Sequence, residues 1–214
     1  MSLPSSSPAR ILDSAVQLFA ARGYDATSVR EICEAAGITK PTLYHFFHSK
    51  DGVFRAIVGD TLEQMHGVVR RALARQTTLT DQLSEMVREV FDDARGRPLL
   101  WRFVFGTVWC PPRAPAAEMH RRYQEMSRTL AGAIEDAARR GEIAPGLTEV
   151  RLLTLMGTVS EALSAYLILG QPALTNELAH AIVESVVHGW QPRTPSARPP
   201  ASPPAGAPAS TPPR

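Results

Sequence analysis

The sequence predicts an all-α protein with a small N-terminal three-helix domain followed by a larger helical body. Apolar residues recur at helical spacing over most of the 214 residues, and no run of alternating β-branched residues is long enough for a sheet. Glycine and proline interrupt this pattern at intervals, which indicates several separate helices. Hydrophobic residues make up 44% of the chain, so it can bury a sizeable core.

The first helix should begin at Pro8 with Ser7 as its N-cap, because proline in the first turn sacrifices no hydrogen bond. Gly23 is expected to end this helix in the left-handed conformation. The apolar face that this helix would turn inward consists of Ile11, Leu12, Ala15, Leu18 and Phe19.

Two short helices are expected next. Ser28 and Glu31 form a capping box at the start of one of them, and Gly37 breaks it where φ should be positive. The other opens at Thr39, with Pro41 tolerated in its first turn. The inward positions of the two helices are Val29, Ile32, Cys33, Leu43 and Phe47.

Longer helices make up the rest of the chain. A helix capped by Ser49 is expected over residues 50–75. The remaining expected helices are 80–95, 98–109, 114–140, 147–169 and 175–190.

Two short helices around a tight glycine turn, followed by a long helix, are typical of a helix-turn-helix that binds DNA. Threonine hydroxyls and a tyrosine phenol donate to phosphate oxygens, lysine reaches a guanine edge or a phosphate, and a proline ring can touch a thymine methyl. The candidate DNA-binding residues are Arg30, Thr39, Lys40, Pro41, Thr42, Tyr44, His45 and Lys50.

Composition divides the chain into four segments. Residues 1–7 are expected to form a flexible lead, residues 8–55 the helix-turn-helix DNA-binding domain, and residues 56–190 the ligand-binding and dimerisation domain. Residues 191–214 contain nine of the 18 prolines and no aliphatic side chain larger than alanine, so they are expected to be a disordered tail. A protein-docking role for the tail is the alternative to a solubilising one.

The net charge of +2 gives no general attraction to nucleic acid. Three arginines lie in 191–214, and without them the chain carries a charge of about −1. DNA binding must therefore depend on a local surface. The only lysines are Lys40 and Lys50, and both lie in the helix-turn-helix segment.

The N-terminal pattern closely resembles the TetR family of transcriptional regulators. The resemblance implies that the candidate DNA-binding residues named above contact DNA. It departs from the family at Phe46, where a histidine is usual; His45 either substitutes for that contact or does not, and Phe46 either packs inward or meets DNA. The residues that carry the resemblance are Ile11, Leu12, Ala15, Leu18, Phe19, Gly23, Tyr24, Thr27, Ser28, Val29, Arg30, Glu31, Ile32, Ala36, Gly37, Ile38, Thr39, Lys40, Pro41, Thr42, Leu43, Tyr44, Phe47, Ser49 and Lys50.

The resemblance also implies a homodimer joined through the last two long helices, 147–169 and 175–190. Small side chains permit close approach of helices, and leucines supply buried apolar surface. The helix 147–169 combines both kinds, namely Gly157, Ser160, Ala162, Ser164 and Ala165 with Leu155, Leu163 and Leu167. A two-fold dimer would match a palindromic double-stranded DNA operator.

Aromatic and methionine side chains gather in the middle of the chain. Most of them should be ordinary core, but some are expected to line an apolar pocket for an unknown small-molecule effector. The candidate ligand-binding residues are Trp101, Phe105, Trp109, Tyr123, Met126 and Met156. By resemblance, the protein is expected to be a repressor that this ligand releases from DNA; an activator, or a regulator that answers to a protein or to no ligand, is the alternative.

Other functions have little support in the sequence. No nucleophile–base pair, phosphate loop or metal-binding spacing occurs, so no catalytic residue, metal or cofactor is assigned and an enzyme is not expected. Glu118, His120 and Tyr123 could hold a metal, but a solvated face is the preferred interpretation; Cys110 could sense oxidants. The absence of a signal peptide and the two lone cysteines predict a cytoplasmic protein, and the apolar run near 152–169 is expected to be too short for a membrane span.

Overall fold

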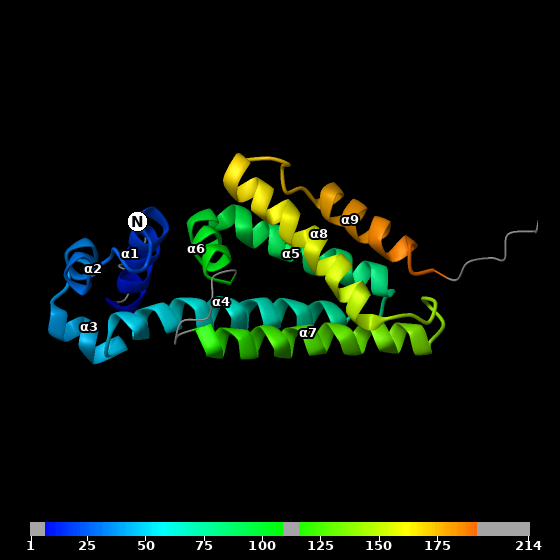
Figure 1. Ribbon diagram of the computed structural model, residues 1–214, viewed down its shortest axis with the longest axis horizontal. Coiled ribbons are helices and arrows are strands. Elements are labelled where there is room, and N and C mark those ends of the chain that lie inside the picture. The colour runs from blue at the N-terminus through cyan, green and yellow to red at the C-terminus, as the bar shows by residue number, and fades with distance from the viewer. Residues whose placement is uncertain (1–6, 109–115, 192–214) are drawn as a thin grey trace, which may run out of the picture.

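The computed structural model describes residues 7–108 and 116–191, and within these ranges the chain is helical without strands. The all-α prediction is therefore confirmed (Figure 1). The helices are α1 (Ser7–Arg22), α2 (Val29–Ala36), α3 (Lys40–Phe47), α4 (Lys50–Leu73), α5 (Leu79–Gly96), α6 (Pro98–Val108), α7 (Ala116–Arg139), α8 (Thr148–Leu169) and α9 (Asn176–His188).

The turns that separate the first helices form as the sequence predicts. Gly23 has a φ of 83° and donates its N–H to the carbonyl of Phe19 at 2.9 Å. The capping box of Ser28 and Glu31 is present in both directions, and Gly37 is left-handed with a φ of 62°. Ser7 is the first residue of α1, so the expected N-cap lies inside the helix.

The start of α3 differs from the prediction in one detail. Thr39 has the extended backbone of an N-cap, with a φ of −91°, but its side chain makes no capping hydrogen bond. Its hydroxyl instead lies 2.9 Å from the hydroxyl of Thr42. The first amide groups of α3 are therefore not satisfied by this side chain, and they stay available to another acceptor.

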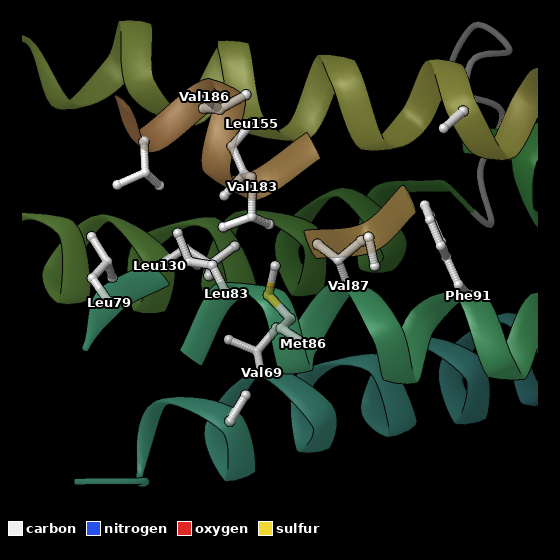
Figure 2. Packing of buried hydrophobic residues seen from close by; sticks show 14 of the residues in the cluster. Val69, Leu79, Leu83, Met86, Val87, Phe91, Leu130, Leu155, Val183 and Val186 are labelled. Carbon is white, nitrogen blue, oxygen red and sulfur yellow. The ribbon is translucent and has the colours of Figure 1, made fainter. Parts of the chain in front are cut away.

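Buried apolar side chains form two clusters. The N-terminal cluster joins α1 to α4 and also takes in Phe103 and Val104 of α6. The body cluster joins α4 to α9 and includes Trp101. Figure 2 shows part of this cluster, with Val69, Met86 and Leu155 among the labelled residues. The division of the chain at residue 55 stays a prediction, since the N-terminal cluster continues along α4 to Leu62. Cys33 lies in this cluster, as expected, and burial raises the pKa of its thiol.

The helix α8 agrees with the expected helix 147–169 to within one residue, but the expectation that its apolar run is too short for a membrane span is wrong by length and composition. It has 22 residues, and by length and composition alone it could cross a membrane. Only 22% of its most apolar window is buried within the chain. Leu153, Ile168 and Leu169 are each about three-quarters exposed. This helix therefore presents an unusually apolar surface that the rest of the described chain does not cover.

Candidate DNA-binding surface and ligand cavity

Most of the candidate DNA-binding side chains share one exposed surface on α3. Lys40, Pro41 and His45 are exposed, and the Tyr44 side chain is 46% exposed. From Ile38 to Lys50 the sequence contains no acidic residue, so nothing on this segment repels phosphate. In Figure 1, α3 lies at the end of the molecule far from α8 and α9, where a groove of DNA has free access to it.

Arg30 lies on α2 beside this surface. Its Nε is 3.1 Å from the Glu34 carboxylate, and both side chains are well exposed, at 74% and 63%. Exposed ion pairs of this kind are worth only about 0–1 kcal/mol. A phosphate can therefore displace Glu34 from Arg30 at small cost.

Lys50 already has two hydrogen-bond acceptors within the free protein. Its Nζ donates to the carbonyls of Tyr24 at 2.9 Å and Thr27 at 2.8 Å, and it lies 4.3 Å from the centre of the Tyr24 ring. The Tyr24 hydroxyl in turn bonds to Asp51, and burial raises the pKa of this phenol. In the free protein Lys50 thus joins the start of α4 to the loop before α2, and one N–H remains for DNA.

Phe46 is not part of either hydrophobic cluster, although its ring lies 6.4 Å from that of Phe47, which packs against the N-terminal one. Its side chain is 42% exposed, and its ring lies 5.0 Å from the His45 ring in an edge arrangement. The packing alternative is therefore not the one that the structure adopts. Phe46 and His45 together extend the exposed surface of α3, which favours the alternative in which Phe46 meets DNA.

Gly52 positions α3 on α4, a role that its place inside a helical sequence does not reveal. A Cβ added there would lie 1.7 Å from the carbonyl oxygen of Phe47, the last residue of α3. Such overlap is possible only for glycine. The close approach sets the angle between α3 and α4, and so the direction in which α3 faces.

The second candidate site is an apolar cavity of about 80 Å³ in the body. Five of the six candidate ligand-binding residues line it, and Trp109 lies outside the described residues. Tyr123 and Ser160 bring hydroxyl groups to the lining, and Trp101 brings an indole N–H that is bonded to Asp93. The lining residues are Leu62, Met65, Val69, Met86, Val87, Val90, Trp101, Val104, Phe105, Tyr123, Met126, Leu130, Met156, Val159, Ser160 and Leu163.

Four consecutive residues of α6 connect this cavity with the rest of the molecule. Trp101 lines the cavity, and Arg102 donates to the Leu167 carbonyl of α8 at 2.8 Å. The Phe103 ring lies 5.3 Å from that of Phe19 and 5.4 Å from that of Phe54 in the N-terminal cluster. Val104 belongs to that cluster and also lines the cavity. The wall of the cavity is thus also part of the core behind α3.

Comparisons with known proteins agree with this arrangement. Residues 11–57 match the family described as bacterial regulatory proteins of the tetR family. The chain is 28% identical to the HTH-type transcriptional regulator UidR of Escherichia coli K12 over 144 residues, 64% of this chain and 69% of that protein. It is 44% identical to the HTH-type transcriptional repressor KstR2 of Rhodococcus jostii over 64 residues, 30% of this chain and 31% of that one.

A solved structure with the same fold is the transcriptional regulator FadR of Bacillus subtilis in complex with stearoyl-CoA. It superimposes with a TM-score of 0.76 at 20% identity, covering 85% of this chain and 98% of that one. The helix-turn-helix, the helical body and these likenesses define a DNA-binding transcriptional regulator. Within that class, residues 11–57 form a DNA-binding domain of the TetR type.

Proposed function

We propose that the protein is a cytoplasmic homodimeric repressor that leaves a palindromic operator when a small, largely apolar ligand occupies the body cavity. The observation that carries the proposal is the position of Val104, which lines the cavity and lies in the core behind α3. KstR2, the relative with 44% identity over 64 residues, is named a repressor, and the FadR neighbour is in complex with stearoyl-CoA.

The DNA-binding role rests on the exposed surface of α3. Tyr44 and Thr42 would donate to phosphates, Lys40 would reach a base edge or a phosphate, and Pro41 and His45 would lie against the groove. Arg30, Thr39 and Lys50 would flank them on the backbone. The structure adds Arg10, whose Nη1 lies 4.0 Å from where a Cβ would sit on Gly37, so it flanks the same turn.

The homodimer rests on the exposed apolar face of α8 and α9. Val150 and Leu153 are exposed there, and a groove of about 600 Å³ between the two helices is lined by small and apolar side chains such as Ala181 and Ile182. An exposed apolar patch of this extent marks an interface. A second copy related by a two-fold axis would cover it with the same two helices and would form a four-helix bundle.

Ligand binding would act on DNA affinity through α6. A ligand that enlarges the cavity displaces Val104 and Trp101, and the same helix carries Phe103 into the N-terminal cluster. Displacement of α6 therefore moves the two α3 helices of a dimer away from the spacing of about 34 Å that successive major grooves require. The ligand lowers DNA affinity by the ratio of its affinities for the two arrangements.

Operator binding by Tyr44→Ala tests this function. On the DNA upstream of its own gene, with unrelated DNA as competitor, the variant should lose specific binding in a gel-shift assay while sedimentation still shows a dimer. Because the phenol is neutral, the salt dependence of any residual binding should not change. Operator binding as tight as that of the unmodified protein would contradict the assignment of α3.

Two charge variants make the test sharper. Lys40→Ala should lower the slope of log affinity against log salt by about 0.9, because one phosphate contact is lost. Arg70→Ala is the matched control: Arg70 is 57% exposed on the body part of α4 and pairs with Glu63 at 3.2 Å, so its removal should leave the slope unchanged.

A protein that regulates without a ligand, or one that activates, would keep the same DNA contacts. It would differ in the response to ligand or in operator position.

A further inference from the structure

A second cavity lies directly outside the first one. It is a cleft of about 410 Å³ between α4 and α5. Met65, Val90 and Trp101 line both the cleft and the inner cavity, so these three side chains are the partition between them. The two spaces are therefore separated by side chains and not by backbone.

The inner cavity alone is small for a ligand. Its volume of about 80 Å³ is below that of an engineered apolar cavity of about 150 Å³ that binds benzene. Joined with the cleft, the space falls within the range of roughly 300–1,000 Å³ that is usual for small-molecule sites. A ligand of ordinary size therefore needs both spaces.

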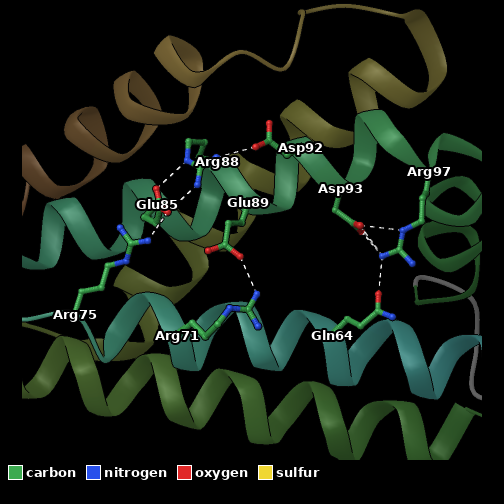
Figure 3. A network of polar contacts seen from close by, with 9 residues as sticks. All are labelled: Gln64, Arg71, Arg75, Glu85, Arg88, Glu89, Asp92, Asp93 and Arg97. Carbon is green, nitrogen blue, oxygen red and sulfur yellow. Dashed lines mark hydrogen bonds and ion pairs between the residues drawn. The ribbon is translucent and has the colours of Figure 1, made fainter.

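Polar contacts frame the cleft. On one side, Arg71 of α4 reaches Glu89 of α5 at 2.8 Å (Figure 3). On the other side, Arg97 reaches Gln64 of α4 at 2.7 Å (Figure 3). The Val68 side chain lines the cleft between these two contacts and does not line the inner cavity. The contacts hold α4 and α5 at the width that keeps the cleft open.

Hydrogen bonds hold Trp101 in the partition between the two spaces. Its indole N–H donates to an Asp93 carboxylate oxygen at 2.8 Å, and Arg97 binds the same carboxylate from Nε at 2.9 Å and Nη2 at 2.7 Å. The Trp101 ring is 1% exposed and packs on Phe105 at 6.0 Å. The acceptor is an ionised carboxylate, so a ligand that turns this ring must replace a hydrogen bond stronger than a neutral one.

The charges around the cleft are compensated. Arg71 pairs with Glu89, Arg97 pairs with Asp93, and Asp92 is bound by Arg88 at 2.8 Å. A charged ligand group would meet both signs at these pairs, so the attraction of one partner is offset by repulsion from the other. An uncharged hydroxyl, ether or carbonyl group can bond to the exposed donors without breaking one.

We propose that the cleft between α4 and α5 is the outer half of the effector site, which takes an uncharged amphipathic molecule. Its hydrocarbon part reaches the inner cavity past Trp101, and its polar end stays in the cleft between Arg71 and Arg97. The inference rests on the proposed function, because it names the ligand class of the cavity that would control DNA binding. An uncharged ligand would differ from the stearoyl-CoA bound to the FadR neighbour, which carries phosphates.

The test uses the full-length protein and the indole N–H resonance of Trp101, which is assigned as the signal missing from Trp101→Phe. Hexan-1-ol should shift this resonance saturably, and hexanoate and hexylammonium, which have the same chain and opposite charges, should bind at least tenfold more weakly. If hexan-1-ol leaves the resonance unmoved, or if a charged probe binds as tightly, the proposal is overturned.

Two filling variants distinguish the halves of the site. Val68→Phe fills only the cleft and Ser160→Leu fills only the inner cavity, and each should weaken hexan-1-ol at least tenfold. Unchanged affinity of Val68→Phe for hexan-1-ol would show that the ligand uses the inner cavity alone. That result would overturn the proposal that the cleft is part of the site. Thermal melting checks that each variant is folded, and Val68→Met replaces Val68→Phe if it is not.

A gel-shift assay separates this inference from the proposed function. Hexan-1-ol that moves the Trp101 signal but leaves the operator complex intact would support the site and contradict its role as the effector site. Operator binding that is absent in every condition would contradict the proposed function and leave the indole result valid by itself.

Discussion

The N-terminal core and the body core are built from the same kinds of side chain but are packed differently. Behind α3, the Phe103 ring lies 5.3 Å from the ring of Phe19 and 5.4 Å from that of Phe54. The body core instead surrounds a cavity of about 80 Å³ next to Trp101. Close-packed cores resist deformation, whereas a void lowers the cost of rearranging the side chains that line it. The first core is suited to carry α3 as a rigid unit, and the second is suited to change shape.

Among the changes that test this difference between the two cores, Gly52→Ala is expected to have the largest effect, on stability and on the position of α3. The new methyl group would lie 1.7 Å from the Phe47 carbonyl oxygen, which is backbone and cannot move aside as a flexible side chain can. We expect a loss of about 4 kcal/mol or more in the free energy of unfolding, or a displaced α3 with operator binding abolished. Denaturant unfolding and gel shift measure the two outcomes.

Gly59→Ala is the control for this change, because it lies on the same helix and a Cβ there meets nothing within 4 Å. It should stabilise the protein by up to about 1 kcal/mol through helix propensity. If the two variants behave alike, the close contact of α3 with α4 is not what positions α3.

A smaller effect is expected from Phe103→Leu, which keeps an apolar side chain in the N-terminal core but removes its ring contacts. Stability should fall by about 1–3 kcal/mol, from imperfect repacking and the loss of two aromatic pairs. Operator release by hexan-1-ol should also require more ligand, since α6 then holds the N-terminal core less firmly. Leu99→Ala, at an exposed position of the same helix, should change neither quantity.

Much of the N-terminal region could be predicted because its signals are local. The capping box at Ser28, the left-handed Gly37 and the exposed Tyr44 each depend on residues within a few positions. The position of Lys50 could not be predicted, because its partners are the carbonyls of Tyr24 and Thr27, more than 20 positions earlier. Spacing along a chain says nothing of which distant carbonyl a lysine will meet.

In the body, fewer features could be predicted, because more of them depend on contacts between different helices. Aromatic and methionine content indicated a cavity, and Trp101, Phe105, Tyr123, Met126 and Met156 do line one. The cleft outside it was not foreseen, since the pairs that frame it join different helices. Helical spacing reveals pairs at three or four residues, such as Arg88 with Asp92, but it does not reveal the pairing of Arg71 with Glu89.

The smallest expected effect is the loss of stability when one helix cap is removed from each region. The Ser28 hydroxyl accepts from the Glu31 amide at 3.2 Å, and the Thr175 hydroxyl accepts from the Leu178 amide at 3.1 Å. Ser28→Ala and Thr175→Ala should each cost about 1 kcal/mol. Because α4 and α6 belong to both cores, both changes should move one common unfolding transition, followed by circular dichroism. Two transitions, each moved by one variant only, would show that the regions unfold separately.

The placement of the two lysines has a practical consequence for handling the protein. Among the 214 residues the only side-chain amines are those of Lys40, which is exposed on α3, and Lys50, whose Nζ is held by two carbonyls. Apart from the amino terminus, an amine-reactive dye or sensor-chip coupling would therefore attach mainly at Lys40. Protein immobilised in this way would have its proposed DNA-binding surface blocked, whereas a dye placed there would report directly on operator binding.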